Sequence, residues 1–366
     1  MSPALQPLVL MTAGGTGGHV YPALAVATDL MARGIRVEWV GTARGLEHRV
    51  VPEAGITLHC LPVRGVRGKS VFDKVLGLCF LVLASVQALW LLYRRSPRCV
   101  VGMGGYVAGP AGVAAWLLRK PLLIHEQNAV AGTTNRMLAP LASQVFAAFP
   151  GAFKQSVETR VIGNPVRSEL VAAGARRHYD FAGQRSLRLL VLGGSLGARP
   201  INQVLPDTLR AVRAGNKQLE VWHQTGEAHV VPVKANYGDL LDEDTRVVPF
   251  IEDMAAAYEW ADLVLCRAGA LTVSELAIMG CPSILVPLPY AIDDHQTANA
   301  RSLSEAGAAK LLPQSDMSAD SLVASLQGYM ANPRLLVSMA AAAHAAATPD
   351  AATRVSDCCE EFIHGR

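Results

Sequence analysis

Short apolar runs, several of them closed by glycine, alternate along the chain with longer helical stretches. An apolar run at residues 8–11 is followed by a glycine loop, a helical stretch at 22–31 and a second apolar run at 36–40. Strand, loop, helix and strand in this order form the repeating unit of a parallel β-sheet. The rhythm continues with an apolar run, a helical stretch and a further apolar run, at residues 99–101, 110–118 and 122–125. The first part of the chain is therefore predicted to form one α/β domain.

The whole pattern restarts after a break in composition. Residues 163–167 read GNPVR, and a new apolar run, glycine loop and helix begin at residue 187. Later apolar runs, with helical segments between them, lie at residues 221–224, 247–249, 263–266 and 283–286. The chain ends in two stretches predicted as helices, at residues 333–344 and 351–363. We therefore predict an α/β protein of two parallel-sheet domains, residues 1–166 and residues 167–344.

Composition narrows the class of protein. The 366 residues are 51% hydrophobic and 17% charged, which supplies two cores and excludes general disorder. A formal net charge of +3 argues against a nucleic-acid-binding protein built on bulk positive charge, and we expect no nucleic-acid partner. Seven cysteines without a C-x-x-C pair argue against a disulfide scaffold or zinc knuckle, so a reducing cytoplasm is expected. The first residues lack the pattern of an export signal.

One uncharged segment departs from the α/β rhythm. Residues 75–93 carry no charge and are flanked by Lys74 on one side and by Arg94 and Arg95 on the other. Such a length nearly suffices for a membrane span, yet the segment contains Ser85 and lies between two strands of one predicted sheet. Three interpretations stay open: a transmembrane helix, a buried crossover helix, or a sheet-packed helix that offers apolar side chains and basic flanks to a membrane surface.

Three glycine loops follow predicted strands, at residues 14–18, 102–106 and 193–197. Glycines let the backbone approach a ligand, and the N–H groups of a following helix favour a negative charge. The first loop is not a dinucleotide fingerprint, because Val20 stands where the last glycine is required and no acidic residue ends the second strand. The loops favour a phosphorylated ligand held between two domains, against the alternative of tight helix–sheet packing alone.

The segment RAGALTVSE at residues 267–275 follows another apolar run. Thr272 and Ser274 stand at the start of a predicted helix, whose free N–H groups suit a diphosphate. Glu275, one turn further, could accept hydrogen bonds from the two hydroxyls of a ribose, or could simply cap the helix.

Eight segments together resemble one family. They are GGTGGHVYPALAVA (14–27), GMGGYVAGP (102–110), HEQNAVAGTTNR (125–136), GNPVR (163–167), GGSLGAR (193–199), FIEDMAAAY (250–258), RAGALTVSE (267–275) and DDHQTANA (293–300). Their order and content resemble the MurG family, the UDP-N-acetylglucosamine–N-acetylmuramyl-(pentapeptide) pyrophosphoryl-undecaprenol N-acetylglucosamine transferases. The resemblance implies a GT-B fold: two Rossmann-like domains facing across a cleft, with a C-terminal helix of about residues 345–366 returning to the first domain. It also implies an inverting glycosyl transfer without metal or cofactor, from UDP-GlcNAc to lipid I, giving lipid II for peptidoglycan.

The same resemblance assigns the donor to the second domain. Its residues would be Ser195 (diphosphate), Ile251 (uracil, through its backbone), Ala270, Leu271, Thr272, Val273 and Ser274 (phosphates), Glu275 (ribose) and Gln296 (sugar). Arg167 resembles the nucleotide-binding arginine of the family. From the first domain, Thr16, Gly17, Gly18 and Asn128 would close over the sugar. Family members differ just before Gln296, where this chain has His295, so the part that His295 plays in sugar selection stays open.

The first domain would hold the acceptor and the catalytic groups. Gly104, Gly105 and Tyr106 are expected to face the acceptor. An inverting displacement needs a base near neutrality to take the proton of the attacking hydroxyl, which suits His19 directly after the first glycine loop. Glu126 is the rival base, or the group that orients the acceptor.

The partners that the resemblance implies are UDP-GlcNAc, membrane-anchored lipid I and an anionic membrane surface. Other proteins of wall synthesis and division are candidate partners, and the expected location is the cytoplasmic face of the inner membrane, as a peripheral protein. Alternatives stay open at this stage: another GT-B glycosyltransferase, a nucleotide-sugar epimerase, a solute-binding protein, or a scaffold with an inactive site.

Overall fold

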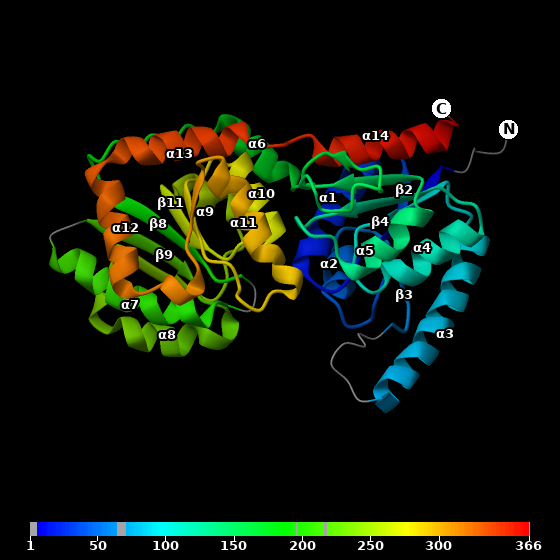
Figure 1. Cartoon of the computed structure of the whole chain (residues 1–366), viewed down its shortest axis with the longest axis horizontal. Helices are drawn as coiled ribbons and strands as arrows, with labels where there is room; N and C mark the ends of the chain where they lie inside the picture. Colours follow the sequence, from blue (N-terminus) through cyan, green and yellow to red (C-terminus); the bar gives the residue numbers. More distant parts are fainter. Residues whose placement is uncertain (1–5, 64–70, 195–196, 216–217, 366) are drawn as a thin grey trace. The chain divides into compact units, whose positions relative to one another are not determined.

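The computed structural model describes residues 6–63, 71–194, 197–215 and 218–365. The chain divides into two compact units (Figure 1). Unit 1 comprises Met1–Arg167 and Pro349–Arg366, and unit 2 comprises Ser168–Thr348. Each unit contains one parallel sheet flanked by helices, so the predicted two-domain α/β architecture is confirmed.

The sheet of unit 1 has seven strands within the described ranges, in the order β3-β2-β1-β4-β5-β6-β7. Its strands are β1 (Leu8–Thr12), β2 (Arg36–Gly41), β3 (Thr57–Cys60), β4 (Cys99–Gly102), β5 (Leu122–Glu126), β6 (Gln144–Ala147) and β7 (Arg160–Val161). Its helices are α1 (Gly17–Ala32), α2 (Glu47–Glu53), α3 (Val71–Arg95), α4 (Ala108–Leu117), α5 (Thr133–Leu138), the short 3-10 helix η1 (Ala139–Leu141) and α14 (Ala351–His364).

Burial of both faces explains why the central strands are apolar throughout. In β1 every residue is buried. Val9 and Met11 belong to a core with residues of α1 and α14, whereas Leu10 belongs to a second core with residues of α3 and α4. Helices therefore cover both faces of this sheet, which is the environment that selects continuous apolar strands over alternating ones.

The C-terminal helix α14 returns to unit 1, as the resemblance implied. Val355 and Cys359 are fully buried in the core that α1 shares. Arg33 after α1 reinforces this contact, because its guanidinium lies 2.7 Å from the carboxylate of Asp357 and 3.5 Å from that of Glu360.

The sheet of unit 2 has six strands in the part of the chain that is described, in the order β10-β9-β8-β11-β12-β13. Its strands are β8 (Leu187–Leu192), β9 (Leu219–Gln224), β10 (Thr245–Val248), β11 (Leu263–Cys266), β12 (Ser283–Leu285) and β13 (Ala309–Leu311). Its helices are α6 (Ser168–Arg176), α7 (Arg199–Ala214), α8 (Val230–Tyr237), α9 (Met254–Trp260), α10 (Ala270–Ile278), α11 (His295–Glu305), α12 (Ala319–Ala331) and α13 (Pro333–Ala345). Short 3-10 helices are η2 (Glu227–His229), η3 (Gly238–Leu240), η4 (Ile292–Asp294) and η5 (Gln314–Asp316).

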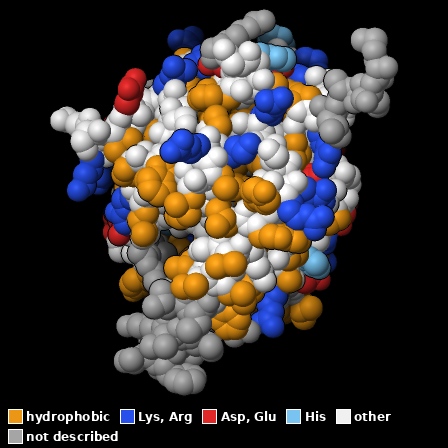
Figure 2. Space-filling view, turned by 90° about the vertical axis from the view of Figure 1, so that its right-hand side faces the viewer, with side chains coloured by type: hydrophobic (Ala, Val, Ile, Leu, Met, Phe, Trp, Pro, Cys, Tyr) orange, Lys and Arg blue, Asp and Glu red, His pale blue; other side chains and the backbone are white. Residues whose placement is uncertain are grey.

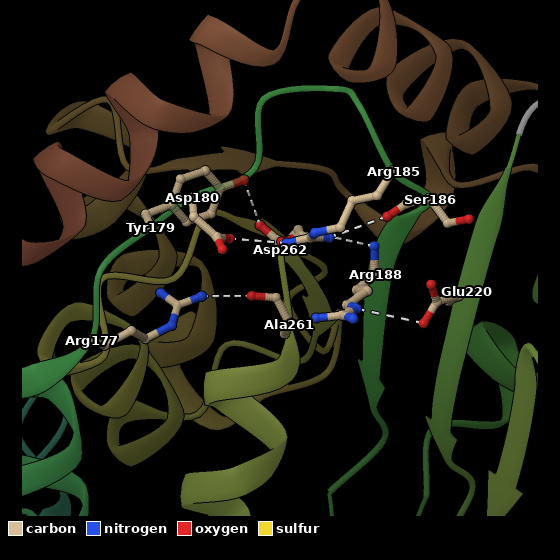
Figure 3. A network of polar contacts seen from close by, with 9 residues as sticks. All are labelled: Arg177, Tyr179, Asp180, Arg185, Ser186, Arg188, Glu220, Ala261 and Asp262. Atoms are coloured by element: carbon tan, nitrogen blue, oxygen red, sulfur yellow. Dashed lines mark hydrogen bonds and ion pairs between the residues drawn. The ribbon is translucent and has the colours of Figure 1, made fainter.

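A polar network fixes the polar stretch before β8 to the amino end of this sheet (Figure 3). The buried carboxylate of Asp262 accepts hydrogen bonds from the guanidinium of Arg185 and, at 2.9 Å, from the backbone N–H of Arg188. This pairing raises the pKa of Arg185 above its ordinary value. Arg177 donates to the carbonyl oxygen of Ala261, and the Tyr179 hydroxyl donates to that of Asp262. The network lies at the amino end of β11, whereas ligands of parallel sheets bind beyond the carboxyl ends of the strands. We therefore assign the network a structural role.

Helix α3 contains the uncharged segment. In the residues that the structure describes, no helix has both the length and the apolar character that crossing a membrane requires. Ala84, Ala88 and Leu92 are fully buried against unit 1, whereas Val86 is 60% and Trp90 is 59% exposed. Over residues 80–95, helix α3 is thus packed along one side and presents apolar side chains on the other, which differs from a crossover helix buried all round.

Candidate active site

Two glycine loops of unit 1 meet where the strand order reverses. The loop at 13–16 follows β1 and the loop at 103–107 follows β4, and these strands are neighbours. In open parallel sheets, ligands bind beyond the carboxyl ends of strands at this kind of position. A Cβ added to Gly105 would lie 2.3 Å from the carbonyl oxygen of Gly14, and the φ of Gly105 is +83°. Only glycine fits, so the two loops are in direct backbone contact.

This contact brings the predicted base to the loops. His19 lies in the first turn of α1 and is half-buried. A Cβ on Gly104 would lie 2.8 Å from Cδ2 of the His19 ring and 3.1 Å from its Nε2. The imidazole therefore packs on the backbone of Gly104, one of the three residues expected to face the acceptor.

The other residues predicted for the site in unit 1 differ in their exposure. Thr16 is exposed just before α1, while Gly17 and Gly18 are half-buried. Tyr106 is 57% exposed. The guanidinium of Arg167, the last residue of unit 1 before α6, lies 5.6 Å from the ring centre of Tyr21 in α1.

Glu126 ends β5 with a carboxylate that is enclosed by donors. The residue is 1% exposed. Its carboxylate accepts hydrogen bonds from the backbone N–H groups of Asn128 and Gly132, each at 3.0 Å, and from Nδ2 of Asn135 at 2.8 Å. Nδ2 of Asn128 also donates to it, at 3.2 Å. Of the two roles open to Glu126, these contacts support positioning, because they occupy the oxygens that a base would need.

A residue that no motif indicated holds the first glycine loop in place. Glu47 is completely buried at the start of α2. Its carboxylate accepts hydrogen bonds from the N–H of Gly15 at 3.1 Å and from the N–H and hydroxyl of Thr42 at 2.9 and 2.7 Å. The indole N–H of Trp39 donates to the carbonyl oxygen of Ala13 at 2.9 Å. A lone carboxylate 32 positions from its partner leaves no spacing signal in the sequence.

Replacing Glu47 with glutamine is expected to lower the free energy of unfolding by about 1–3 kcal/mol, because the new amide would turn a donor toward the N–H donors of the loop. Thermal unfolding with and without UDP would measure the loss. Glu53→Gln, at an exposed position of the same helix, is the matched control. Equal melting temperatures for the two variants would contradict this role.

In unit 2 the corresponding loop and helix follow β8 and β11, again neighbouring strands. Ser195 lies outside the described residues. Helix α10 begins after Gly269, whose position has no side-chain cap. The hydroxyl of Ser274 donates to the carbonyl oxygen of Ala270 at 3.1 Å, so it is turned toward its own helix. Leu271 and Thr272 are half-buried, and Val273 is buried.

Two further residues predicted to bind UDP-GlcNAc, Glu275 and Gln296, already form hydrogen bonds within unit 2. Glu275 is 7% exposed, and its Oε2 accepts a hydrogen bond from the hydroxyl of the fully buried Tyr258 at 3.0 Å. Burial and the adjacent carboxylate raise the pKa of Tyr258, which therefore stays a donor. Oε1 of Gln296 accepts from the N–H of Leu288 at 3.0 Å. His295 is half-buried at the first position of α11.

Gln224 is a second residue that the motifs did not reveal. Its Nε2 donates to the carbonyl oxygen of Gly194 at 3.1 Å, and its Oε1 accepts from the N–H of Ile251 at 3.1 Å. One side chain thus joins the glycine loop to the predicted uracil contact. The N–H of Ile251 is committed to this bond.

Two family models match the chain in order. They are the glycosyltransferase family 28 N-terminal domain, over residues 9–147, and the glycosyltransferase family 28 C-terminal domain, over residues 188–355. The chain belongs to glycosyltransferase family 28. The two matches fall in unit 1 and unit 2, with the last residues of the second match in α14.

Relatives within family 28 are similar over nearly the full length. Proteins of Stutzerimonas stutzeri (strain A1501) and Azotobacter vinelandii are each 51% identical over 357 residues, covering 98% of this chain and 99% of their own. Both are named UDP-N-acetylglucosamine–N-acetylmuramyl-(pentapeptide) pyrophosphoryl-undecaprenol N-acetylglucosamine transferase. The crystal structure of Acinetobacter baumannii MurG is 40% identical, with a TM-score of 0.80 over 97% of this chain and 99% of that one. The resemblance to the MurG family is confirmed.

A more distant structure shares only the fold. A Listeria monocytogenes protein described as a UDP-N-acetylglucosamine 2-epimerase is 15% identical, with a TM-score of 0.69 over 99% of this chain and 98% of that one. The GT-B architecture is thus shared by transferases and by a protein described as an epimerase. The architecture by itself therefore does not distinguish the two activities.

Proposed function

We propose that this chain transfers N-acetylglucosamine from UDP-GlcNAc to the muramyl 4-hydroxyl of lipid I, undecaprenyl-pyrophosphoryl-MurNAc-pentapeptide, giving lipid II. The observation that carries the proposal is the 51% identity, over 98% of the chain, to transferases named for this reaction. The epimerase alternative rests on a likeness of 15% identity, which concerns fold alone. The protein is thus assigned as a hexosyltransferase of peptidoglycan synthesis.

The donor nucleotide is proposed to bind unit 2. The amino end of α10 would face the diphosphate, together with the loop that contains Ser195, and Glu275 would accept the ribose hydroxyls. Ile251 would contact the uracil through its backbone carbonyl, because its N–H is committed to Gln224. Gln296 would contact the sugar through its amide N–H₂, because its oxygen is committed to Leu288. Arg167 would offset the charge that grows on the leaving UDP.

The acceptor is proposed to bind the loops of unit 1 around Gly104, Gly105 and Tyr106. The acceptor oxygen attacks C1 of GlcNAc from the face opposite to the phosphate, so the configuration inverts. The C1–O bond breaks, its electron pair leaves with UDP, and His19 takes the proton of the hydroxyl. Thr16, Gly17, Gly18 and Asn128 would border the transferred sugar. Glu126 would position Asn128 through the bonds that enclose its carboxylate.

UDP release from UDP-GlcNAc, with and without a short-chain lipid I analogue and in the presence of EDTA, tests the proposed function. Release that requires the analogue and survives the chelator is expected. Release without any acceptor would instead indicate a hydrolase or an epimerase. Full loss of activity in EDTA would overturn the metal-independent mechanism.

The exposed side of α3 and α4 is proposed to dock on an anionic membrane surface, where lipid I is anchored. Exposed apolar side chains there include Val86, Trp90, Tyr93, Trp116 and Leu117. Figure 2 shows the face of the molecule that carries these helices, with hydrophobic side chains across its middle and Lys and Arg side chains around and among them. Apolar side chains with basic neighbours are typical of surfaces that bind anionic lipid. The proposed location is peripheral, at the cytoplasmic face of the inner membrane.

Reversing Arg94 and Arg119 together is expected to weaken binding to phosphatidylglycerol vesicles by about tenfold or more at low salt, since each basic residue near such a surface contributes roughly 1 kcal/mol. Both residues are exposed; Arg94 lies in the last turn of α3, and Arg119 follows the end of α4. Arg95 is left intact, because its Nε lies 3.2 Å from the buried carboxylate of Glu38 and its loss would disturb the core.

Vesicle co-sedimentation measures this effect. Reversal of Arg210 and Arg334 in unit 2 matches the change in charge and should leave binding unchanged. If the two double variants bind alike, or if wild-type binding to neutral vesicles in high salt is equally strong, the electrostatic part of the docking proposal is wrong.

A further inference from the structure

Gln127 is a buried polar residue beside the loops of unit 1 that no assignment above uses. It follows Glu126 directly after β5 and is 1% exposed. Its Nε2 lies 3.1 Å from Nδ1 of His125 and donates to the carbonyl oxygen of His125 at 3.2 Å. Its backbone carbonyl oxygen accepts from Nδ2 of Asn164 at 3.1 Å. Both its backbone and its amide nitrogen are therefore fixed.

His125 determines which way the amide of Gln127 points. Nε2 of His125 lies 2.9 Å from the carbonyl oxygen of Gly163, which can only accept, so Nε2 carries the proton. His125 is completely buried, and this burial lowers its pKa to about 4. The ring is therefore neutral near pH 7, and Nδ1 is an acceptor. An acceptor at Nδ1 requires the N–H₂ of Gln127 to face His125, so Oε1 must point the other way.

Oε1 of Gln127 points toward the candidate active site. A Cβ on Gly104 would lie 3.6 Å from this oxygen and 3.1 Å from Nε2 of His19. The amide oxygen and the imidazole thus both lie beside the backbone of Gly104, so close to it that a Cβ there would collide with the His19 ring. The φ of +91° at Gly104 likewise favours glycine. Oε1 is buried and has no hydrogen-bond partner among the residues that the structure describes. A buried acceptor without a partner destabilises the folded chain unless a ligand satisfies it.

We propose that Oε1 of Gln127 accepts a hydrogen bond from a carbohydrate hydroxyl of the acceptor substrate, held beside the His19 ring. Gln127 is in this view a substrate-positioning residue, and His125 acts through it by fixing the orientation of its amide. The inference rests on the proposed function, because it takes a sugar hydroxyl of the acceptor as the donor that satisfies Oε1 in the complex. A hydroxyl has a single proton, and the attacking hydroxyl gives its proton to His19, so the group that Oε1 binds is a neighbouring hydroxyl of the same sugar. Holding that neighbour fixes the orientation of the attacking one.

Gln127→Met removes the amide oxygen and keeps a similar volume. We expect kcat/KM for the lipid I analogue to fall about tenfold, as for the loss of one hydrogen bond to a buried acceptor. The Kd for UDP should stay within about twofold of wild type, because the nucleotide is assigned to unit 2. Gln144→Met, on β6 of the same sheet and with its amide bonded to the backbone of Val145, is the matched control. Equal kcat/KM values for the two variants would overturn the inference.

A pair of substitutions at His125 tests the orientation of the amide. Asparagine places an oxygen near the position of Nδ1 and can still accept from Gln127, whereas glutamine places a donor near Nε2 and preserves only the contact with Gly163. We expect His125→Asn to retain several-fold more activity than His125→Gln. Loss of buried volume alone predicts the opposite order, because asparagine leaves the larger cavity. The opposite order, or equal activity, would refute the part played by His125.

Binding of the lipid I analogue, measured alongside turnover, separates this inference from the proposed function. If the wild-type chain binds the analogue several-fold more tightly than Gln127→Met but releases no UDP, the proposed transfer is wrong and the contact stands. If the wild-type chain transfers the sugar and Gln127→Met binds and turns over the analogue equally well, only the contact is wrong.

Discussion

Replacing His19 with alanine is expected to lower kcat by about 100-fold or more, with the Kd for UDP little changed. A positioned general base contributes on the order of 10²–10⁴ to the rate, and the imidazole is the group packed on Gly104 at the meeting point of the two glycine loops. Donor affinity is spared because the nucleotide is assigned to unit 2. Acceptor-dependent UDP release measures kcat, and calorimetric titration with UDP measures Kd.

His48→Ala is the matched control for this prediction, since His48 is an exposed histidine on α2 of the same unit. Turnover close to that of wild type in His19→Ala would remove His19 as the base. Because Glu126 is enclosed by N–H donors, we expect it not to replace His19.

Replacing Glu275 with alanine is expected to weaken UDP binding by about 30- to 150-fold. The variant loses two charge-assisted hydrogen bonds to the ribose, for which roughly 2–3 kcal/mol in total is a typical loss. Comparison of UDP with 2′-deoxy-UDP locates the effect, because the wild-type chain should prefer UDP and Glu275→Ala should bind both alike.

Tyr258→Phe is the control, because it removes only the hydroxyl that donates to Glu275 within unit 2. Its preference for UDP over the deoxy analogue should persist. A Glu275→Ala variant that still prefers UDP by the wild-type ratio would show that this carboxylate does not bind the ribose.

Periodicity along the chain predicted the central strands of both sheets and the edge strand β10, but it missed the other outer strands. The runs at 8–11, 36–40, 99–101 and 122–125 are β1, β2, β4 and β5, which are covered by helices on both faces. Strands β3, β7 and β13 were not predicted, nor was β6 next to β7. An edge strand such as β3, whose end residues are exposed, is short and lacks the apolar run that marks a strand buried on both faces.

The motifs likewise predicted the residues that a ligand would require but not those that support them. Glycines at 14–18 and 102–106 indicated where the backbone has no room for a side chain, and the structure places the backbones of these two loops in contact. Glu47 and Gln224 support the loops of units 1 and 2 from 32 and 30 positions away in the sequence. Side chains that act across such separations follow no local spacing, so a single sequence does not reveal them.

The sequence by itself determined the two α/β domains, their glycine loops and the resemblance to the MurG family, because local periodicity and contiguous motifs carry that information. Only the tertiary structure decided that α3 is buried on one side and exposed on the other, that the carboxylate of Glu126 is enclosed, and that the amide oxygen of Gln127 faces the loop beside His19. These properties depend on which neighbouring residues exclude water from a side chain and which of them form hydrogen bonds with it. Such neighbours are set by packing between distant segments, which the order of residues along the chain does not display.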